Sequence, residues 1–439
     1  MATLPEMRSE LGLANETPPL SRREAVVEAH RCIGCADAPC TAACPTGIDV
    51  AGFIRKIATG NERGAARTIL SANILGMSCA HSCPVQVLCE GACVCHHRQP
   101  PEPPIAIGRL QAFATDTVID EGRRLFAAGK PSGFSVGVVG AGPAGLAAAH
   151  ELRRLGHACT IYEKGSFPGG LNTTGIAPYK LTAARAVAEA EWLLGIGGID
   201  LVTDVRIPDD LSWEELEARH DALFIGTGLG PDRRLGLPGE DLPGVLGALR
   251  FIATMKCGVV SLEDVGRAVV IGGGNTAVDA VRELLRLGVE EVSLVYRGPR
   301  SAMRAYPHEF QAALKEGARA FFQHQPVRFE GGERVSKVIF RLLDEERRPL
   351  PGREATLAAD LVLVAIGREP PTAFLRGLEG VEIRDGRIVV DETGATGRPG
   401  VFAAGDVVNG GLEVVFAVAG GREAARAIHR RLQRVKAHV

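Results

Sequence analysis

Apolar runs, glycine turns and helical spacing recur in the same order at two places in the chain. An apolar run at 136–139 is followed by Gly140-x-Gly142-x-x-Gly145 and then by a helical pattern. The segment 266–288 repeats this strand–turn–helix order, and a further apolar strand, ACTIYEK or EEVSLVYRG, follows each copy. Buried strands that alternate with helices are typical of parallel sheets built from βαβ units.

A different pattern fills the first 130 residues. Asp49 and Asn61 precede two segments with helical spacing, VAGFIRKIA and ERGAARTIL, and both residue types are good N-caps. Apolar residues also recur at helical spacing over 105–126. We therefore predict a small helical domain with little hydrophobic core of its own.

The last part of the chain returns to the strand-and-helix pattern. GRPGVFAAGDVVNG predicts a strand that ends before Gly405-Asp406, and VVFAVAGGREAARAIHRRL predicts a long helix. The predicted fold class is α/β, with two Rossmann-like dinucleotide-binding domains and an N-terminal α-helical domain. The predicted domains are 1–130 (helical), 131–232 with 366–439 (first dinucleotide domain) and 233–365 (second dinucleotide domain).

Composition narrows the class of protein. The formal net charge of -2 gives no field that would favour nucleic acid or a membrane surface as a partner. Glycine, at 54 of 439 residues, is enriched mainly in turns after apolar runs, which favours nucleotide binding. The sequence has no apolar run of membrane-spanning length and no signal-peptide core at its start, so we expect a cytoplasmic protein.

The cysteines are concentrated near the start of the chain. Nine of the eleven lie between Cys32 and Cys95, and the first four read C-x2-C-x4-C-x3-C-P. In the similar cysteine motif of bacterial ferredoxins, the first three cysteines bind one cluster and the fourth binds a second cluster. We therefore predict two [4Fe–4S] clusters.

Two such clusters need eight ligands. The predicted ligands are Cys32, Cys35, Cys40 and Cys93 for the first cluster and Cys44, Cys83 and Cys89 for the second. The second cluster lacks one ligand, for which Cys79, Cys95 and a non-cysteine residue are the candidates. Structural zinc is the alternative, although zinc sites usually present two clean C-x2-C pairs.

The first glycine turn has the context of a dinucleotide site. Its glycines permit the tight turn, close approach of the pyrophosphate and close packing of the helix, and Glu163 follows where a ribose partner belongs. Gly405 and Asp406 with the later helix form a pattern that closes FAD sites in flavoproteins with two dinucleotide domains. Asp406 is expected near the ribityl–phosphate region, and the helix start near Val414 is expected to point its positive end at the flavin.

The second glycine turn predicts a nicotinamide-nucleotide site. It contains Gly272 and Gly274, and the strand that follows ends in Arg297 rather than in an acid. An arginine there accommodates the 2′-phosphate of NADP, so NADP(H) is favoured and NAD(H) remains open. Two such sites in series predict hydride transfer from nicotinamide to flavin, which needs no catalytic acid or base. Cys159 and Cys257 are solitary, which argues against disulfide reduction.

The chain resembles the pyridine-nucleotide–FAD–iron–sulfur module shared by the glutamate synthase small subunit and dihydropyrimidine dehydrogenase. The stretches that carry the resemblance include CIGCADAPCTAACPTGIDV, CAHSCPVQVLCEGACV, VVGAGPAGLAAAHELRRLGH, LFIGTGLG, VVIGGGNTAVDA and VFAAGDVVNGG. It implies a fold like that of glutathione and thioredoxin reductases. Further cofactor-binding residues that it implies are Pro143, Ala144, Lys164, Gly170, Leu171, Gly228, Asn275, Thr276 and Val415.

The resemblance also implies the missing eighth ligand. In dihydropyrimidine dehydrogenases a glutamine from an IGxLQ segment ligates one cluster, and the matching segment here ends at Gln111. This glutamine favours the separate pyridine-nucleotide subunit of bacterial dihydropyrimidine dehydrogenase. Two features depart from the family pattern. The stretch between Cys93 and Gln111 contains the extra Cys95. The Gly298-Pro299 step after Arg297 alters the turn, which usually carries two arginines in this family.

The implied partner is an FMN-bearing subunit, since the chain contains no FMN barrel. For a dihydropyrimidine dehydrogenase subunit, the expected partner is similar to dihydroorotate dehydrogenase. For a glutamate synthase small subunit, the expected partner is the glutamate synthase large subunit. A free-standing NAD(P)H:acceptor reductase and a flavoprotein with a zinc-stabilised docking domain are the remaining alternatives.

Overall fold

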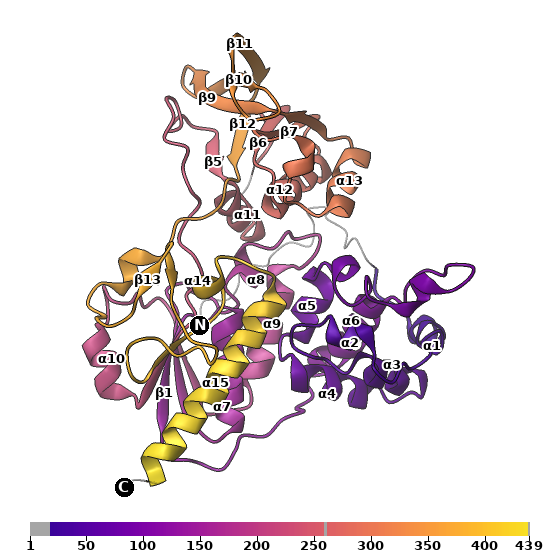
Figure 1. The fold of residues 1–439 in the computed structure, drawn as a ribbon, viewed down its shortest axis with the longest axis vertical. Coiled ribbons are helices and arrows are strands. Elements are labelled where there is room, and N and C mark those ends of the chain that lie inside the picture. Colours follow the sequence, from indigo (N-terminus) through magenta and orange to yellow (C-terminus); the bar gives the residue numbers. More distant parts are fainter. Residues whose placement is uncertain (1–17, 259–260, 438–439) are drawn as a thin grey trace. The chain divides into compact units, whose positions relative to one another are not determined.

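The computed structural model describes residues 18–258 and 261–437. These residues form two compact units (Figure 1). The larger unit contains 18–173, 184–229 and 370–437, and the smaller unit contains 174–183 and 230–369. The chain therefore passes between units near the predicted boundaries at 232 and 366. The short segment 174–183, which packs with the smaller unit, has no counterpart in the predicted boundaries.

The first part of the larger unit is helical, as the spacing predicts. Its helices are α1 (Arg22–His30), α2 (Pro39–Ala42), α3 (Val50–Ala58), α4 (Glu62–Ala72), α5 (Gly76–Ser82) and α6 (Ile107–Asp120). Asp49 caps α3 by accepting a hydrogen bond from Gly52 N, and Asn61 caps α4 in the same way through Gly64 N. The prediction that the last helix reaches residue 126 was wrong, because Gly122 takes φ +61°, a left-handed conformation that ends helices.

The helical region has a substantial core, contrary to the expectation from its sequence. Phe53 and Ile57 of α3, Ile69 of α4 and Leu110 of α6 are all fully buried. Each buried side chain of this size contributes about 1.5–3 kcal/mol relative to exposure. Apolar packing therefore supplements any stability that bound clusters provide.

The rest of the larger unit is a parallel sheet with helices on both faces. Its strands β1 (Ser135–Val139), β2 (Ala158–Tyr162), β3 (Ile199–Val202), β4 (Ala222–Ile225) and β15 (Val401–Ala403) lie in the order β15-β4-β1-β2-β3. The helices are α7 (Pro143–Arg154), α8 (Leu171–Thr174), α9 (Ala183–Leu194), α10 (Trp213–Arg219), α14 (Asp406–Asn409) and α15 (Val414–Ala437). Helix α10 covers one face of the sheet, and α7 and α15 cover the other (Figure 1).

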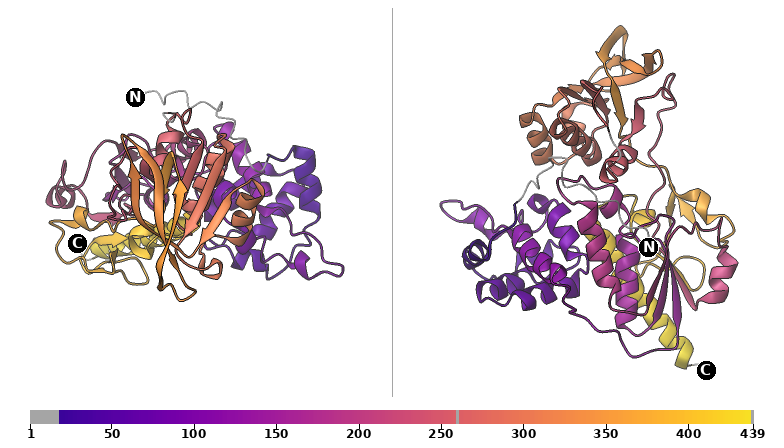
Figure 2. Two further views of the ribbon diagram at one scale, coloured as in Figure 1. Left: turned by 90° about the horizontal axis from the view of Figure 1, so that it is seen from above. Right: turned by 180° about the vertical axis from the view of Figure 1, so that it is seen from behind.

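The smaller unit contains a second parallel sheet. Its strands β5 (Val245–Gly247), β12 (Leu361–Val364), β6 (Arg267–Ile271), β7 (Glu291–Tyr296) and β8 (Arg319–Phe322) lie in that order. Its helices are α11 (Ala248–Lys256), α12 (Asn275–Arg286) and α13 (Pro307–Lys315). A separate antiparallel sheet is formed by β9 (His324–Gly331), β10 (Val335–Leu343) and β11 (Pro349–Ala358), and Figure 2 shows it in orange.

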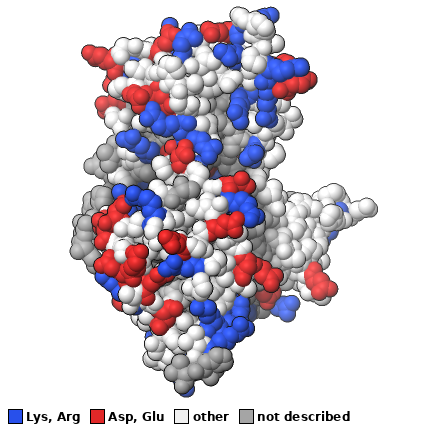
Figure 3. Space-filling view, turned by 60° about the vertical axis from the view of Figure 1, so that its left-hand side comes forward, with Lys and Arg blue, Asp and Glu red and all other residues white. Residues whose placement is uncertain are grey.

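The surface carries both signs of charge. Lysine and arginine are interspersed with aspartate and glutamate on the face shown in Figure 3. No helix among the described residues is both long enough and apolar enough to cross a membrane.

Candidate cofactor sites

The first glycine turn connects β1 to α7, and two of its glycines leave no room for a side chain. Gly140 has φ +101°, and a Cβ there would lie 2.7 Å from the carbonyl oxygen of Gly226. A Cβ on Gly145 would lie 1.9 Å from the carbonyl oxygen of Gly140. Gly142 is the N-cap of α7 and Pro143 is its first residue, so the helix starts where the predicted pyrophosphate belongs.

Glu163, the predicted ribose partner, lies directly after β2 and is tied to this turn. Its Oε2 accepts a hydrogen bond from Ala141 N and its Oε1 accepts one from Gly165 N, both at 2.8 Å. A carboxylate offers about four lone-pair sites, so it retains acceptor capacity for ribose hydroxyls. Lys164 is exposed.

Two loops lie on either side of the first glycine turn. Gly169 N donates to Ala141 O at 2.8 Å, and a Cβ on Gly170 would lie 2.9 Å from the Cα of Gly142, just before Leu171 opens α8. On the other side, Thr227 and Gly228 follow β4, which ends at Ile225.

The predicted set of cofactor-binding residues did not include Thr227. Its hydroxyl Oγ1 is buried and has no hydrogen-bond partner among the described residues. A Cβ on Gly140 would lie 3.1 Å from the Cα of Thr227, so the hydroxyl belongs to a residue that borders the turn. A buried hydroxyl without a partner, beside the glycine turn, fits a site where a dinucleotide binds. Thr227 lies within the stretch LFIGTGLG, which is the feature of the sequence that could have indicated it.

The C-terminal segment reaches the same turn. A Cβ on Gly405 would lie 3.0 Å from the Cβ of Ala144, and one on Gly421 of α15 would lie 2.2 Å from Ala144 O. This close approach places Asp406, the first residue of α14, near the start of α7. Helix α15 begins at Val414, and Val415 is buried. The residues of both segments fit the FAD site that the sequence predicts.

The predicted ligands of the first cluster converge. Their thiols line one cavity together with apolar side chains of α3 and of the segment 92–107. The cysteines that line it are Cys32, Cys35, Cys40, Cys93 and Cys95. Burial raises the pKa of the Cys40 thiol to about 11, so ligation there must displace a firmly held proton. Cys95 lies with the first group, which removes it as a candidate for the second cluster.

The second thiol group gathers around the end of α5. A hydrogen bond with Cys79 and burial raise the pKa of Cys83 well above the usual value, and the charges of Cys89 and Cys44 act on it in the same direction. Burial raises the pKa of Cys89 to about 12. Gln111 is buried, and its Nε2 donates to the carbonyl oxygen of Gly76, the first residue of α5, at 2.7 Å.

A single-ion site gains no support from the described residues. Within 18–258 and 261–437, no group of three or more histidine, cysteine, aspartate or glutamate side chains has the arrangement that one metal ion requires.

The second glycine turn lies in the smaller unit, between β6 and α12. Gly272 has φ +156°, and a Cβ there would lie 2.3 Å from Ala365 O. Gly274 is the N-cap of α12, whose first two residues are Asn275 and Thr276. Asn275 Oδ1 accepts a hydrogen bond from Tyr306 N at 3.0 Å, which joins α12 to the start of α13.

Three arginines follow this turn. Arg297 is exposed directly after β7, and the guanidinium of Arg300 lies 5.5 Å from the centre of the Phe310 ring. Arg304 was not predicted, but its backbone N donates to Gly273 O at 2.9 Å, so it lies beside the glycine turn. Of the three, Arg297 lies directly after the strand, and its role as the 2′-phosphate partner stays a prediction.

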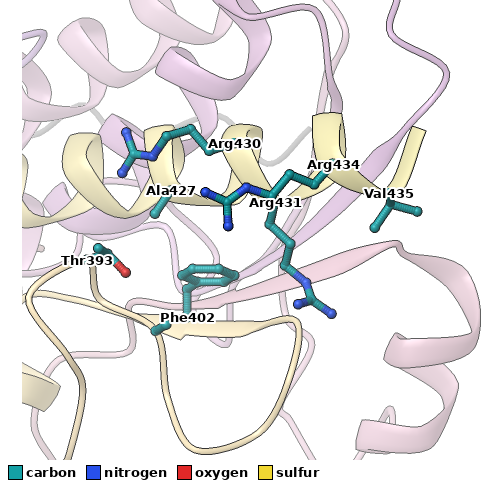
Figure 4. Close-up of a pocket in the computed structure, with 8 residues that line it drawn as sticks. Thr393, Phe402, Ala427, Arg430, Arg431, Arg434 and Val435 are labelled. Carbon is teal, nitrogen blue, oxygen red and sulfur yellow. The ribbon is translucent and has the colours of Figure 1, made fainter. Parts of the chain in front are cut away.

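A separate cavity of about 390 Å³ lies elsewhere on the larger unit (Figure 4). It is lined by Phe402 of β15 and by Arg430, Arg431 and Arg434 in the second half of α15. The predicted flavin residues lie at the start of that helix, so this cavity belongs to none of the predicted cofactor sites.

The class of protein follows from comparison with known families. A family model described as pyridine nucleotide-disulphide oxidoreductase matches residues 134–424, which is more than half of the chain. A second model, described as dihydropyrimidine dehydrogenase domain II, 4Fe-4S cluster, matches residues 11–123. The chain therefore belongs to the pyridine nucleotide-disulphide oxidoreductase family and carries an iron–sulfur domain.

The relatives narrow this class and confirm the predicted resemblance. The chain is 35% identical to the NAD-dependent dihydropyrimidine dehydrogenase subunit PreT of Escherichia coli K12, over 95% of this chain and 96% of that protein. It is 34% identical to the glutamate synthase [NADPH] small chain of Azospirillum brasilense, over 92% and 88%. It is an oxidoreductase with FAD, NAD(P) and iron–sulfur cofactors, similar to the electron-transfer subunits of larger enzymes.

Solved structures confirm the predicted fold. FprA of Mycobacterium tuberculosis matches with a TM-score of 0.59 and 21% identity, over 70% of this chain and 86% of that one. The thioredoxin reductase of T. acidophilum matches with a TM-score of 0.57 and 24% identity, over 68% and 99%.

Proposed function

We propose that this chain is the electron-input subunit of a dihydropyrimidine dehydrogenase. In this proposal FAD accepts hydride from NAD(P)H, and single electrons leave through two [4Fe–4S] clusters to an FMN-containing partner of dihydroorotate-dehydrogenase type. The observation that carries the proposal is the convergence of two thiol groups in the same compact unit as the FAD turn. Each [4Fe–4S] cluster needs four ligands, which are four cysteines at the first centre and three cysteines with Gln111 or Cys79 at the second.

Contacts within the larger unit support electron transfer between its parts. Arg422 of α15 donates to Thr46 O at 3.1 Å, two residues after Cys44. Glu189 of α9 accepts hydrogen bonds from Met77 N and Ser78 N of α5. Helices α15 and α9 of the flavin fold thus contact the segments that carry thiols of the second group.

The chain's own residues have distinct roles in this proposal. The glycine turns and the start of α7 bind phosphates, Glu163 binds ribose, and Asp406 with α15 holds the flavin end. Arg297 binds the 2′-phosphate of NADP, and Gly272, Gly274, Asn275 and Thr276 cradle the nicotinamide dinucleotide. Cofactor choice differs between the named relatives, one described as NAD-dependent and the other as NADPH-linked.

The glutamate synthase small subunit is the second candidate. The similarity to the Azospirillum chain favours it almost equally, whereas Gln111 at the position of the expected eighth ligand favours dihydropyrimidine dehydrogenase. In either case the partner subunit would bind FMN.

Anaerobic reduction of the purified chain tests the proposal. NADPH or NADH should bleach the flavin absorbance and generate the EPR signals of reduced [4Fe–4S] clusters without any other protein. Flavin bleaching without a cluster signal would contradict the electron exit. Affinity purification of the tagged chain from its own cells should then recover an FMN protein, and recovery of a much larger glutaminase-containing subunit would favour the second candidate.

A further inference from the structure

The first thiol cavity contains one cysteine more than a cluster needs. Cys32, Cys35, Cys40, Cys93 and Cys95 all line it, whereas a [4Fe–4S] cluster takes four thiolates. The sequence assigned four of these to the first cluster and left Cys95 as one candidate for the second. The structure therefore raises the question of what the fifth thiol does.

Cys95 lies beside Cys93 and is as well buried. The exposed fractions of the two residues are 1% and 6%, and their side chains are hydrogen-bonded to each other. Cys93 is the N-cap of a short 3₁₀ helix, Val94–His97, of which Cys95 is the second residue. The two sulfurs thus lie close together at the wall of the same cavity.

The segment that follows Cys95 is held by two arginines. Arg31 donates to Pro103 O at 2.6 Å, and Arg98 pairs with Glu102 at 2.7 Å. This segment leads to Ile105 and Ile107, which line the same cavity as the cysteines.

We propose that Cys95 is a reserve ligand of the first cluster, able to bond to the same iron as Cys93. The inference rests on the proposed cluster in this cavity. In the exchange, one iron–sulfur bond to Cys93 breaks and one to Cys95 forms, while the proton of the incoming thiol passes to the outgoing thiolate. No electron is gained or lost, and the adjacent sulfurs need little movement of the chain.

Alanine variants test the exchange, because alanine offers no oxygen ligand in place of sulfur. Cys93→Ala and Cys95→Ala should each retain about eight irons per chain, whereas the double variant should retain about four. The EPR signal of the first cluster should change in Cys93→Ala, since a different thiolate then binds the iron, and should stay unchanged in Cys95→Ala. FAD content should remain constant in all three variants and serves as the control for folding.

Two results would overturn the inference. A loss of about four irons in either single variant would show that this cysteine is the sole fourth ligand, and full iron in the double variant would show that neither is a ligand. Cys35→Ala, which has no such reserve, should lose the cluster. Full iron in Cys35→Ala, or wild-type protein without iron and sulfide, would instead contradict the proposed cluster itself.

Discussion

The amide of Gln111 is held by one hydrogen bond, from its Nε2 to Gly76 O, at the start of the helix that leads to Cys79 and Cys83. The amide oxygen is the atom with ligand character for iron. Two candidates thus remain for the eighth ligand, because Cys95 lines the first cavity, whereas Cys79 contacts Cys83 and Gln111 is bonded to the first residue of the same helix.

Replacement of Gln111 separates these candidates. Gln111→Ala should remove or alter one of the two cluster signals in low-temperature EPR of the reduced protein, while FAD stays bound, because the second cluster loses a ligand. Cys79→Ala removes the rival candidate and, if Gln111 is the ligand, should leave both cluster signals intact. An unchanged spectrum in Gln111→Ala would refute the glutamine assignment.

Arg297 carries the prediction of cofactor choice. A hydrogen bond to a charged group is worth about 1.5–3 kcal/mol, so Arg297→Ala should raise the KM for NADPH by roughly 10–100-fold and leave that for NADH nearly unchanged. Steady-state reduction of an artificial acceptor measures both constants. Arg353→Ala, an exposed arginine on β11, should change neither. Equal losses for both nucleotides would mean that Arg297 does not read the 2′-phosphate.

At the level of single residues, the sequence was most informative where a backbone constraint leaves no choice. Gly140 and Gly145 are required because any Cβ would collide with a carbonyl oxygen, and such glycines recur in a fixed pattern. Thr227 was missed because its relevance depends on burial without a partner, which no spacing reveals. Cys95 was misplaced among the candidates for the second cluster because spacing alone does not show which cavity a thiol faces.

Helix α9 is one of the elements that join the helical region to the flavin fold. Its Glu189 is fully buried, and the carboxylate accepts bonds from Met77 N, Ser78 N and the Ser78 hydroxyl at the start of α5. Arg185, one turn earlier, pairs with Asp116 on α6, the helix that carries Gln111. One helix therefore positions both elements that surround the second thiol group.

This contact predicts a pH-dependent stability. Burial raises the pKa of Glu189 to about 7 from an ordinary value near 4.5. The folded state thus holds the proton more tightly, so the stabilisation is present below pH 4.5 and is lost as pH rises through 7. The free energy of unfolding should therefore fall by roughly 3 kcal/mol between pH 5 and pH 8 because of Glu189.

Glu189→Gln should remove this dependence, because the amide does not ionise. Thermal unfolding followed by flavin fluorescence should show that Tm falls less between pH 5 and pH 8 in the variant than in the wild type. Glu191→Gln, an exposed residue on the same helix, is the control and should behave as the wild type. Parallel pH profiles for Glu189→Gln and wild type would rule out this role.

Helices and strands were predictable wherever the spacing of apolar residues coincides with a capping residue or a glycine turn. The caps at Asp49 and Asn61 and both strand–turn–helix units lie where their patterns predict. The core of the helical region was underestimated, since the interlocking of α3, α4 and α6 depends on contacts between helices that are distant in sequence.

At the scale of the whole molecule, the sequence predicted two nucleotide domains and a metal domain but not the path of the segment 174–183. Within the smaller unit, Lys180 of this segment pairs with Asp279 of α12 and Glu309 of α13, each at 2.8 Å. Tyr179 also donates to Asp279 at 2.7 Å. Such long-range ion pairs leave no local pattern, so the domain to which the segment belongs was not visible in the sequence.

The central claim is that one chain holds a flavin and two clusters. The measurement that tests it most directly is the content of iron, acid-labile sulfide, zinc and flavin in anaerobically purified protein. The account predicts about eight irons, about eight sulfides and about one FAD per chain. Zinc without sulfide would contradict it and would leave a flavin reductase with a structural metal domain.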